Sequence, residues 1–319
     1  MIKQLLKRLV EKEASAAASW TRYYLFLRQA HRDSKFTSKV ARALGLRELD
    51  ANQPLFPNKN RDTIFILAGG ASVNRLSAGQ FDIINSAASI GINFWPIHSF
   101  VPTALSNEVD NDEGGPDLAA RFLRKRTIEY GLLPQSSPLI LLLRPAWPPN
   151  PSRIYSIKGG SKKLTYVYGR ANVITRKTKN LDSDLKRIVR RAEKNRLSPN
   201  ILPDNGSSVV RLTFLALMQG FKKIVWVGVD QDGGPYFWTE EPIPETYREA
   251  ATKFPRKSGE PHSTSNSEKR PFSNDSFLRS LARVISRFSQ SEIFVSHSAS
   301  KLSDTIPVYP WPKNATNRE

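Results

Sequence analysis

Residues 206–230 read GSSVVRLTFLALMQGFKKIVWVGVD, and this stretch decides the fold class. Its first part predicts a helix over 209–219, because apolar residues recur on one helical face and Gly220 suits the C-cap. The apolar run 224–229 follows without polar alternation, which is typical of a parallel strand buried on both faces. A helix that leads directly into such a strand is the repeating unit of α/β folds. Asp230 then lies just past the carboxyl end of the strand, where open α/β sheets bind their ligands.

Further strands and helices alternate around this unit. The sequence TIFIL at 63–67 is a short, β-rich apolar run that suits a central strand. Other strands are predicted at 82–92, 138–143 and 292–296, and other helices at 182–196 and 277–288. This alternation predicts an α/β fold with a Rossmann-like, mainly parallel sheet flanked by helices.

The composition excludes several classes of protein. With 39% hydrophobic and 24% charged residues among 319, the chain is not generally disordered. It has no Cys and four His, which excludes disulfides and thiolate metal sites and leaves little for a His-based metal cage. We therefore expect no cofactor and no metal. No apolar run is long enough to span a bilayer, and the N-terminus lacks the pattern of a secretory signal, so we expect a cytoplasmic protein.

The net charge of +19 is concentrated in two segments. Residues 1–61 carry +8 and residues 151–203 carry +11, which leaves the rest of the chain neutral. We therefore expect a neutral core with basic additions. The predicted organisation is a basic helical extension and linker at 1–61, a Rossmann-like domain at 62–312 and a tail at 313–319. The domain would include the basic insert 151–203 and a lid loop at 232–275.

The basic segments have several possible roles. IKQLLKRLVEK at 2–12 predicts a basic amphipathic helix, and a second helix at 14–30 adds interfacial aromatics such as Trp20. These helices can pack on the core, contact an anionic membrane at the inner face, or bind nucleic acid. The stretch 52–61 is polar and rich in Pro and Asn, as expected of a linker. The helix at 182–196 is either a solvated basic face or a platform for something anionic.

Small and polar residues follow two of the predicted strands. In AGGAS at 68–72, Gly69 and Gly70 allow close backbone approach and Ser72 can cap a helix, an arrangement that lets N–H groups reach a phosphate or nucleotide. Glycines after a strand also serve plain tight turns. Asn93 is predicted at the carboxyl end of the next strand.

A second polar group precedes the helix at 209–219. Ser207 and Ser208 lie at its predicted N-terminus, where backbone N–H groups favour an anion. Asp230, at the far end of the following strand, is either a ligand-binding residue or a loop cap. These residues complete the set of candidate site residues that the sequence pattern itself supports.

Four segments together resemble a known family. They are ILAGGASVNRL at 66–76, GINFW at 91–95, the stretch 206–230, and IFVSHSASKLSDTIP at 293–307. In this order they look like the bacterial sialyltransferases of glycosyltransferase family 42, and like the wider group that includes flagellin nonulosonate transferases and hydroxymethylpterin diphosphokinases. The resemblance implies a Rossmann-like domain with a small lid and a CMP-activated acidic sugar as donor, without a metal.

The resemblance also implies roles for individual residues. The residues matched to donor binding are Gly69, Gly70, Ser72, Asn93, Ser207, Ser208 and Asp230. Gly69 stands where the family has Asn. Of the two phosphate-binding tyrosines of the family, Tyr236 matches one, and Asp232 stands in place of the other. His262 resembles the lid histidine that acts as general base, a role that suits a neutral imidazole near pH 7.

These inferences lead to one expected function and two alternatives. We expect a glycosyltransferase that moves a sialic acid or related nonulosonate from a CMP-activated donor to a surface glycan acceptor. The first alternative is a hydroxymethylpterin-type diphosphokinase that uses ATP and magnesium, with Asp230 and Asp232 as carboxylates. The second is a noncatalytic basic protein that binds nucleic acid, although no known reader motif appears.

Overall fold

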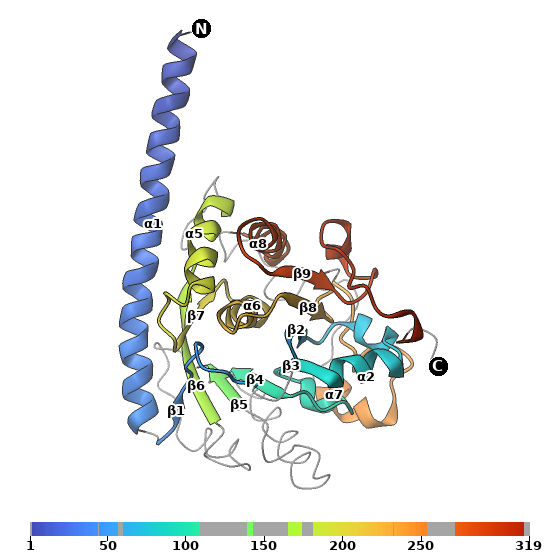
Figure 1. The fold of residues 1–319 in the computed structure, drawn as a ribbon. Helices are drawn as coiled ribbons and strands as arrows, with labels where there is room; N and C mark the ends of the chain where they lie inside the picture. The colour runs from blue at the N-terminus through green and yellow to red at the C-terminus, as the bar shows by residue number, and fades with distance from the viewer. Residues whose placement is uncertain are drawn as a thin grey trace.

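The computed structural model describes residues 2–43, 45–56, 60–108, 139–142, 165–173, 181–231, 233–253 and 272–315. In these residues the predicted α/β fold is confirmed, since nine parallel strands form one sheet with helices on its faces (Figure 1). The strands are β1 (Arg47–Glu48), β2 (Asn60–Leu67), β3 (Ala87–Ile92), β4 (Ala104–Glu108), β5 (Leu139–Leu142), β6 (Thr165–Asn172), β7 (Ile201–Asp204), β8 (Lys223–Val227) and β9 (Glu292–Val295). The helices are α1 (Ile2–Ala43), α2 (Ala78–Ser86), α5 (Leu181–Glu193), α6 (Ser208–Met218), α7 (Arg248–Lys253) and α8 (Asn274–Phe288).

The strand order creates a switch point in the sheet. The order is β1-β6-β5-β4-β3-β2-β8-β9, and β7 also pairs with β6. From β2 the chain builds the sheet in one direction through β3 to β6, and it later adds β8 and β9 on the other side of β2. After β2 the chain continues towards β3, and after β8 it continues towards β9. The loops after these two neighbouring strands therefore lead in opposite directions along the sheet. Ligands of open α/β sheets bind at such a point.

Strand β2 is buried on both faces, as the apolar run at 63–67 predicts. Ile64 and Ile66 belong to the core on the side of α1, α5, α6 and α8. Phe65 and Leu67 belong to the core on the opposite side, which contains Trp95 and the ring pair of Phe237 and Trp238. Neither face of this part of the sheet is left to solvent.

The N-terminal segment is one helix, whereas two were predicted. Helix α1 continues from Ile2 to Ala43 because the stretch 11–19 contains no Gly or Pro and is rich in Ala, the strongest helix former. Its buried residues include Phe26 and Ala30, which pack in the main core. Of the three roles predicted for this segment, packing on the core is therefore present, while the domain boundary at 52–61 stays a prediction.

Two other predictions are corrected by the structure. Residues 82–86 belong to α2, not to a strand, because Ser77 and Gln80 form a capping box that starts the helix. The basic segment 151–203 is not an attachment in its described part. It supplies β6, α5 and β7, and β6 pairs with β1, β5 and β7.

Candidate active site

The loops after β2 and β8 are joined by hydrogen bonds at the switch point. The N–H of Gly70 donates to the carbonyl of Gly228 at 2.8 Å. The N–H of Ser72 donates to the Asp230 carboxylate at 2.9 Å, and the Ser72 hydroxyl donates to the other carboxylate oxygen. Asp230 and Ser72 are both buried. The predicted strand-end residues thus lie together, although the chain separates them by 158 positions.

Gly70 is required by this close approach. Its φ of −70° is ordinary for any residue, so the backbone itself does not demand glycine. A Cβ at this position would lie 2.4 Å from Asp230 Oδ2 and 2.6 Å from the Gly228 carbonyl oxygen. The space that glycine leaves open is therefore occupied by the β8 loop.

This geometry changes the interpretation of the AGGAS turn. The sequence predicts that its N–H groups approach a phosphate, yet those of Gly70 and Ser72 already have partners within the chain. A phosphate beside Ser72 would also meet the Asp230 carboxylate, which carries the same sign of charge. In this conformation Ser72 and Asp230 fasten two loops together and position the neighbouring residues of the edge.

Two stacked aromatic rings cover the first glycine of the turn. Tyr236 and Trp238 have ring centroids 4.3 Å apart and planes at 16°. A Cβ on Gly69 would lie 3.0 Å from Trp238 and 3.3 Å from Tyr236. The Phe237 N–H donates to the Gly69 carbonyl at 2.9 Å. A side chain larger than glycine would displace this pair, which gives a physical reason for glycine rather than Asn at position 69.

Asn93 occupies the same edge of the sheet, directly after β3. Its φ is 48°, a left-handed conformation that Asn tolerates better than most residues. Its N–H donates to the Ser106 carbonyl at 2.8 Å, which fixes the turn against β4. The following residue, Phe94, has its ring 5.5 Å from that of Trp238. Asn93 therefore lies one residue from the aromatic cluster of the switch point.

A second polar cluster lies where β7 leads into α6. Asp204 is fully buried and pairs with Arg211 at 2.9 Å and with Arg170 at 2.8 Å. Its carboxylate also accepts the N–H of Ser207 at 3.1 Å, and Arg211 donates to the Ser208 hydroxyl at 2.8 Å. Ser207 is the N-cap residue as predicted, but its side chain accepts no capping hydrogen bond; the Asp204 carboxylate accepts the N–H groups of Gly206 and Ser207 just before the helix. The two serines thus lie at a helix N-terminus beside two guanidinium groups.

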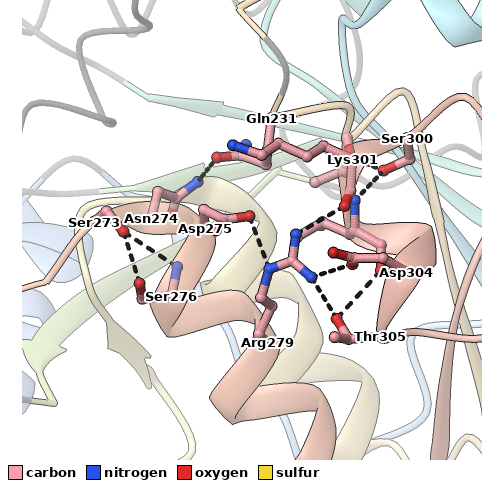
Figure 2. A network of polar contacts seen from close by, with 12 residues as sticks. Gln231, Ser273, Asn274, Asp275, Ser276, Arg279, Ser300, Lys301, Asp304 and Thr305 are labelled. Atoms are coloured by element: carbon pink, nitrogen blue, oxygen red, sulfur yellow. Dashed lines mark hydrogen bonds and ion pairs between the residues drawn. The ribbon is translucent and has the colours of Figure 1, made fainter.

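A third network fastens the N-terminal part of α8 to the segment after β9 (Figure 2). Arg279 donates to Asp275 at 3.1 Å, to Thr305 at 2.6 Å and to the Lys301 carbonyl at 2.7 Å, and it also pairs with Asp304. In the same network Asn274 donates to Gln231 at 3.2 Å. The loop after β8 is therefore held from both sides, by the AGGAS turn and by α8.

His297 was not predicted as a site residue, yet it lies just after β9 at the same edge. Its Nδ1 accepts the Ala299 N–H at 2.9 Å, so the neutral ring carries its proton on Nε2. Burial and the nearby Arg75 lower the pKa of His297, while Asp230 opposes that shift. Its position directly after the predicted strand 292–296 could have identified His297 as a candidate site residue.

The lowered pKa of His297 predicts a pH dependence of stability. Because the folded pKa lies below the unfolded value of about 6.5, the stabilising contribution of the neutral ring is complete above that pH and is lost as the pH falls from there through the folded pKa. Protonation of Nδ1 would also remove the hydrogen bond from Ala299. We expect His297→Gln to lose less unfolding free energy than the wild type between about pH 8 and pH 5.5 in urea titrations. The exposed His31→Gln is the control, and equal losses in all three proteins would contradict this assignment.

The remaining predicted catalytic residues, Asp232 and His262, lie outside the described residues. Within the described ranges, no group of three His, Asp or Glu side chains is arranged to hold a metal ion. The helices of the same ranges include none that is long and apolar enough to cross a membrane.

The chain has a distant likeness to a solved structure. No protein-family model and no curated protein matches the chain. Among solved structures, it is similar to the MAf glycosyltransferase from Magnetospirillum magneticum AMB-1, with 13% sequence identity and a TM-score of 0.42. The match covers 85% of this chain and 37% of that chain, so this chain spans little more than a third of the MAf length. The resemblance to family 42 stays a prediction from the motifs.

Proposed function

We propose that the chain is a glycosyltransferase that transfers a nonulosonate from a CMP-activated donor to a glycan acceptor. The observation that supports it most is the meeting of Gly69, Asn93, Asp230 and Tyr236 at one edge of a parallel sheet. These residues come from the loops after β2, β3 and β8, and they carry the family resemblance in the sequence. They meet at the switch point, where nucleotide ligands of open α/β sheets bind.

The CMP phosphate and the sugar carboxylate of the donor need protein groups that bind negative charge. Tyr236 is half-buried and presents an aromatic ring with a hydroxyl that could donate to the departing phosphate. Ser207 and Ser208 combine hydroxyl groups with a helix N-terminus and the neighbouring Arg170 and Arg211. Such a combination suits the phosphate or the sugar carboxylate, since guanidinium groups and helix N-termini both favour anions.

The reaction needs a base for the acceptor hydroxyl. As the acceptor oxygen bonds to the anomeric carbon, its proton passes to the base and the bond between that carbon and the CMP phosphate oxygen breaks. We assign the base to His262 and keep Asp232 as the next candidate. The electron pair of the broken bond remains on the phosphate of CMP, where Tyr236 and the serines would stabilise the charge.

Ligand-induced stabilisation tests the proposed donor. We expect CMP without metal to raise the free energy of unfolding by about 2.7 kcal/mol at a hundredfold excess over its dissociation constant. The measurement is a thermal-shift panel of CMP, UDP, ADP and ATP, each with and without magnesium. Stabilisation only by ATP with magnesium would contradict the CMP donor and favour the diphosphokinase.

A further inference from the structure

The outward face of α5 carries Lys186, Arg187 and Arg190 beside Ser183, with Asp182 and Glu193 partly exposed near the two ends of the helix. The residues that α5 buries are Leu181, Asp184, Leu185, Ile188, Val189 and Ala192. The cations Lys186, Arg187 and Arg190 lie between these positions on the opposite side of the helix, and Lys194 directly follows its last residue. We call these four residues, together with Arg287 of α8, the basic strip.

Three members of the strip surround one aromatic ring. Lys186 Nζ lies 4.2 Å from the centroid of the Phe288 ring, Arg190 Cζ lies 5.2 Å away, and Arg287 Cζ lies 5.3 Å away. Within the part of the chain that the structure describes, none of the three cations forms an ion pair with a carboxylate. Gathering like charges costs free energy, which an anionic surface would recover.

Exposed apolar side chains border the strip on the α1 side. The guanidinium carbon of Arg187 lies 4.5 Å from the centroid of the Trp20 ring, which joins α1 to the strip. Trp20 is 59% exposed, and Tyr24, about one helical turn further along α1, is 65% exposed. Helices α1, α5 and α8 follow one another across this part of the molecule (Figure 1). The result is a surface of cations edged by two amphipathic aromatic side chains.

We propose that this surface binds the headgroup region of an anionic lipid bilayer. Cations at a bilayer surface gain from the negative potential of anionic lipids, and Trp and Tyr favour the interface between headgroups and acyl chains. The basic amphipathic sequence pattern at 2–12 of α1 favours a membrane over a nucleic acid, because apolar side chains gain from acyl chains but offer no ring on which a base can stack. The proposal extends the predicted membrane contact of the N-terminal helix to a defined surface on α5 and α8, and it does not depend on the reaction.

Vesicle binding by the full chain tests the surface. The measurement is cosedimentation with phosphatidylcholine vesicles with and without phosphatidylglycerol. We expect binding only to the vesicles with phosphatidylglycerol, and a fall of at least about 30-fold in Arg190→Glu/Arg287→Glu, two exposed positions that need not disturb the fold. The matched control is Lys222→Glu/Arg248→Glu, which changes the net charge equally at exposed positions just before β8 and on α7 and should bind as the wild type does.

Three results would overturn the proposal. They are no binding to phosphatidylglycerol vesicles, an equal loss of binding in the two double variants, and displacement of bound protein from the vesicles by poly(U) RNA at equal phosphate concentration. The last result would assign the surface to nucleic acid. Circular dichroism of each variant shows that a loss of binding is not a loss of fold.

Discussion

Asp204→Asn is expected to lower the free energy of unfolding by about 3–5 kcal/mol, because it leaves two guanidinium groups without their carboxylate. Arg211 is 1% exposed and Asp204 is fully buried, so water cannot replace the lost partner. The substitution keeps the volume of the side chain and removes its charge. It would also weaken the hydrogen bonds that Asp204 accepts from the N–H groups of Gly206 and Ser207, directly before α6.

The matched control for this prediction is Asp182→Asn. Asp182 pairs with Arg283 at 2.8 Å, but the two side chains are 44% and 60% exposed. An exposed pair of this kind contributes about 0–1 kcal/mol. Urea unfolding of both variants measures the difference. Equal losses of unfolding free energy in the two variants would show that the buried Asp204 network stabilises the fold no more than an exposed ion pair does.

Gly70→Ala is expected to cost about 3 kcal/mol through steric overlap and the loss of the Ser72–Asp230 hydrogen bonds. The added methyl group would lie 2.4 Å from Asp230 Oδ2, so one of the two loops must move. Because these loops form the proposed donor site, the same variant should also lose the stabilisation by CMP. Thermal unfolding with and without CMP measures both effects.

Gly220→Ala separates this steric effect from backbone strain. Gly220 has a φ of +79°, and a Cβ there would meet no atom within 4 Å. This control should cost about 1–2 kcal/mol, the ordinary penalty for a left-handed residue, and should keep its response to CMP. If Gly70→Ala were as stable as the wild type and still responded to CMP, the two loops would not be packed as described.

The sequence predicts the buried strands well, because their signal is local. Continuous apolar runs at 63–67 and 224–229 predict strands covered on both faces, and β2 and β8 have that environment. The apolar face of the helix before β8 and Gly220 at its end predicted that helix equally well. The neighbours of each strand were not predictable in this way. That β2 pairs with both β3 and β8 depends on contacts between distant parts of the chain.

The sequence identified several residues of the candidate site, but not the hydrogen-bond and ion-pair partners of those residues. Asp230 and Ser72 were each identified from their position after a strand, whereas their hydrogen bond joins residues 158 positions apart. The sequence pattern therefore predicted a phosphate where the structure has a carboxylate. Asp204 was missed because a buried acid reveals itself only through its partners, Arg170 and Arg211.

The sequence pattern also predicted two helices where the structure has the single helix α1. The amphipathic pattern at 2–12 ends before the Ala-rich stretch, which predicts helix by propensity but shows no apolar face. Its packing against β6 and α5 could not be inferred from that stretch, since the contacts come from residues such as Arg22 and from Asp184 of a distant segment. Tertiary contacts thus decide whether this helix belongs to the core.

The release of CMP from a CMP-activated nonulosonate separates the proposed transferase from the diphosphokinase. The measurement is mass spectrometric detection of CMP from CMP-N-acetylneuraminic, CMP-pseudaminic and CMP-legionaminic acids, with lactose or water as acceptor and no divalent metal. We predict CMP release from at least one donor by the wild type and from none by His262→Gln, with His31→Gln as active as the wild type. Folded wild-type protein that releases no CMP from any of the three, but consumes ATP with magnesium, would contradict the proposed transferase.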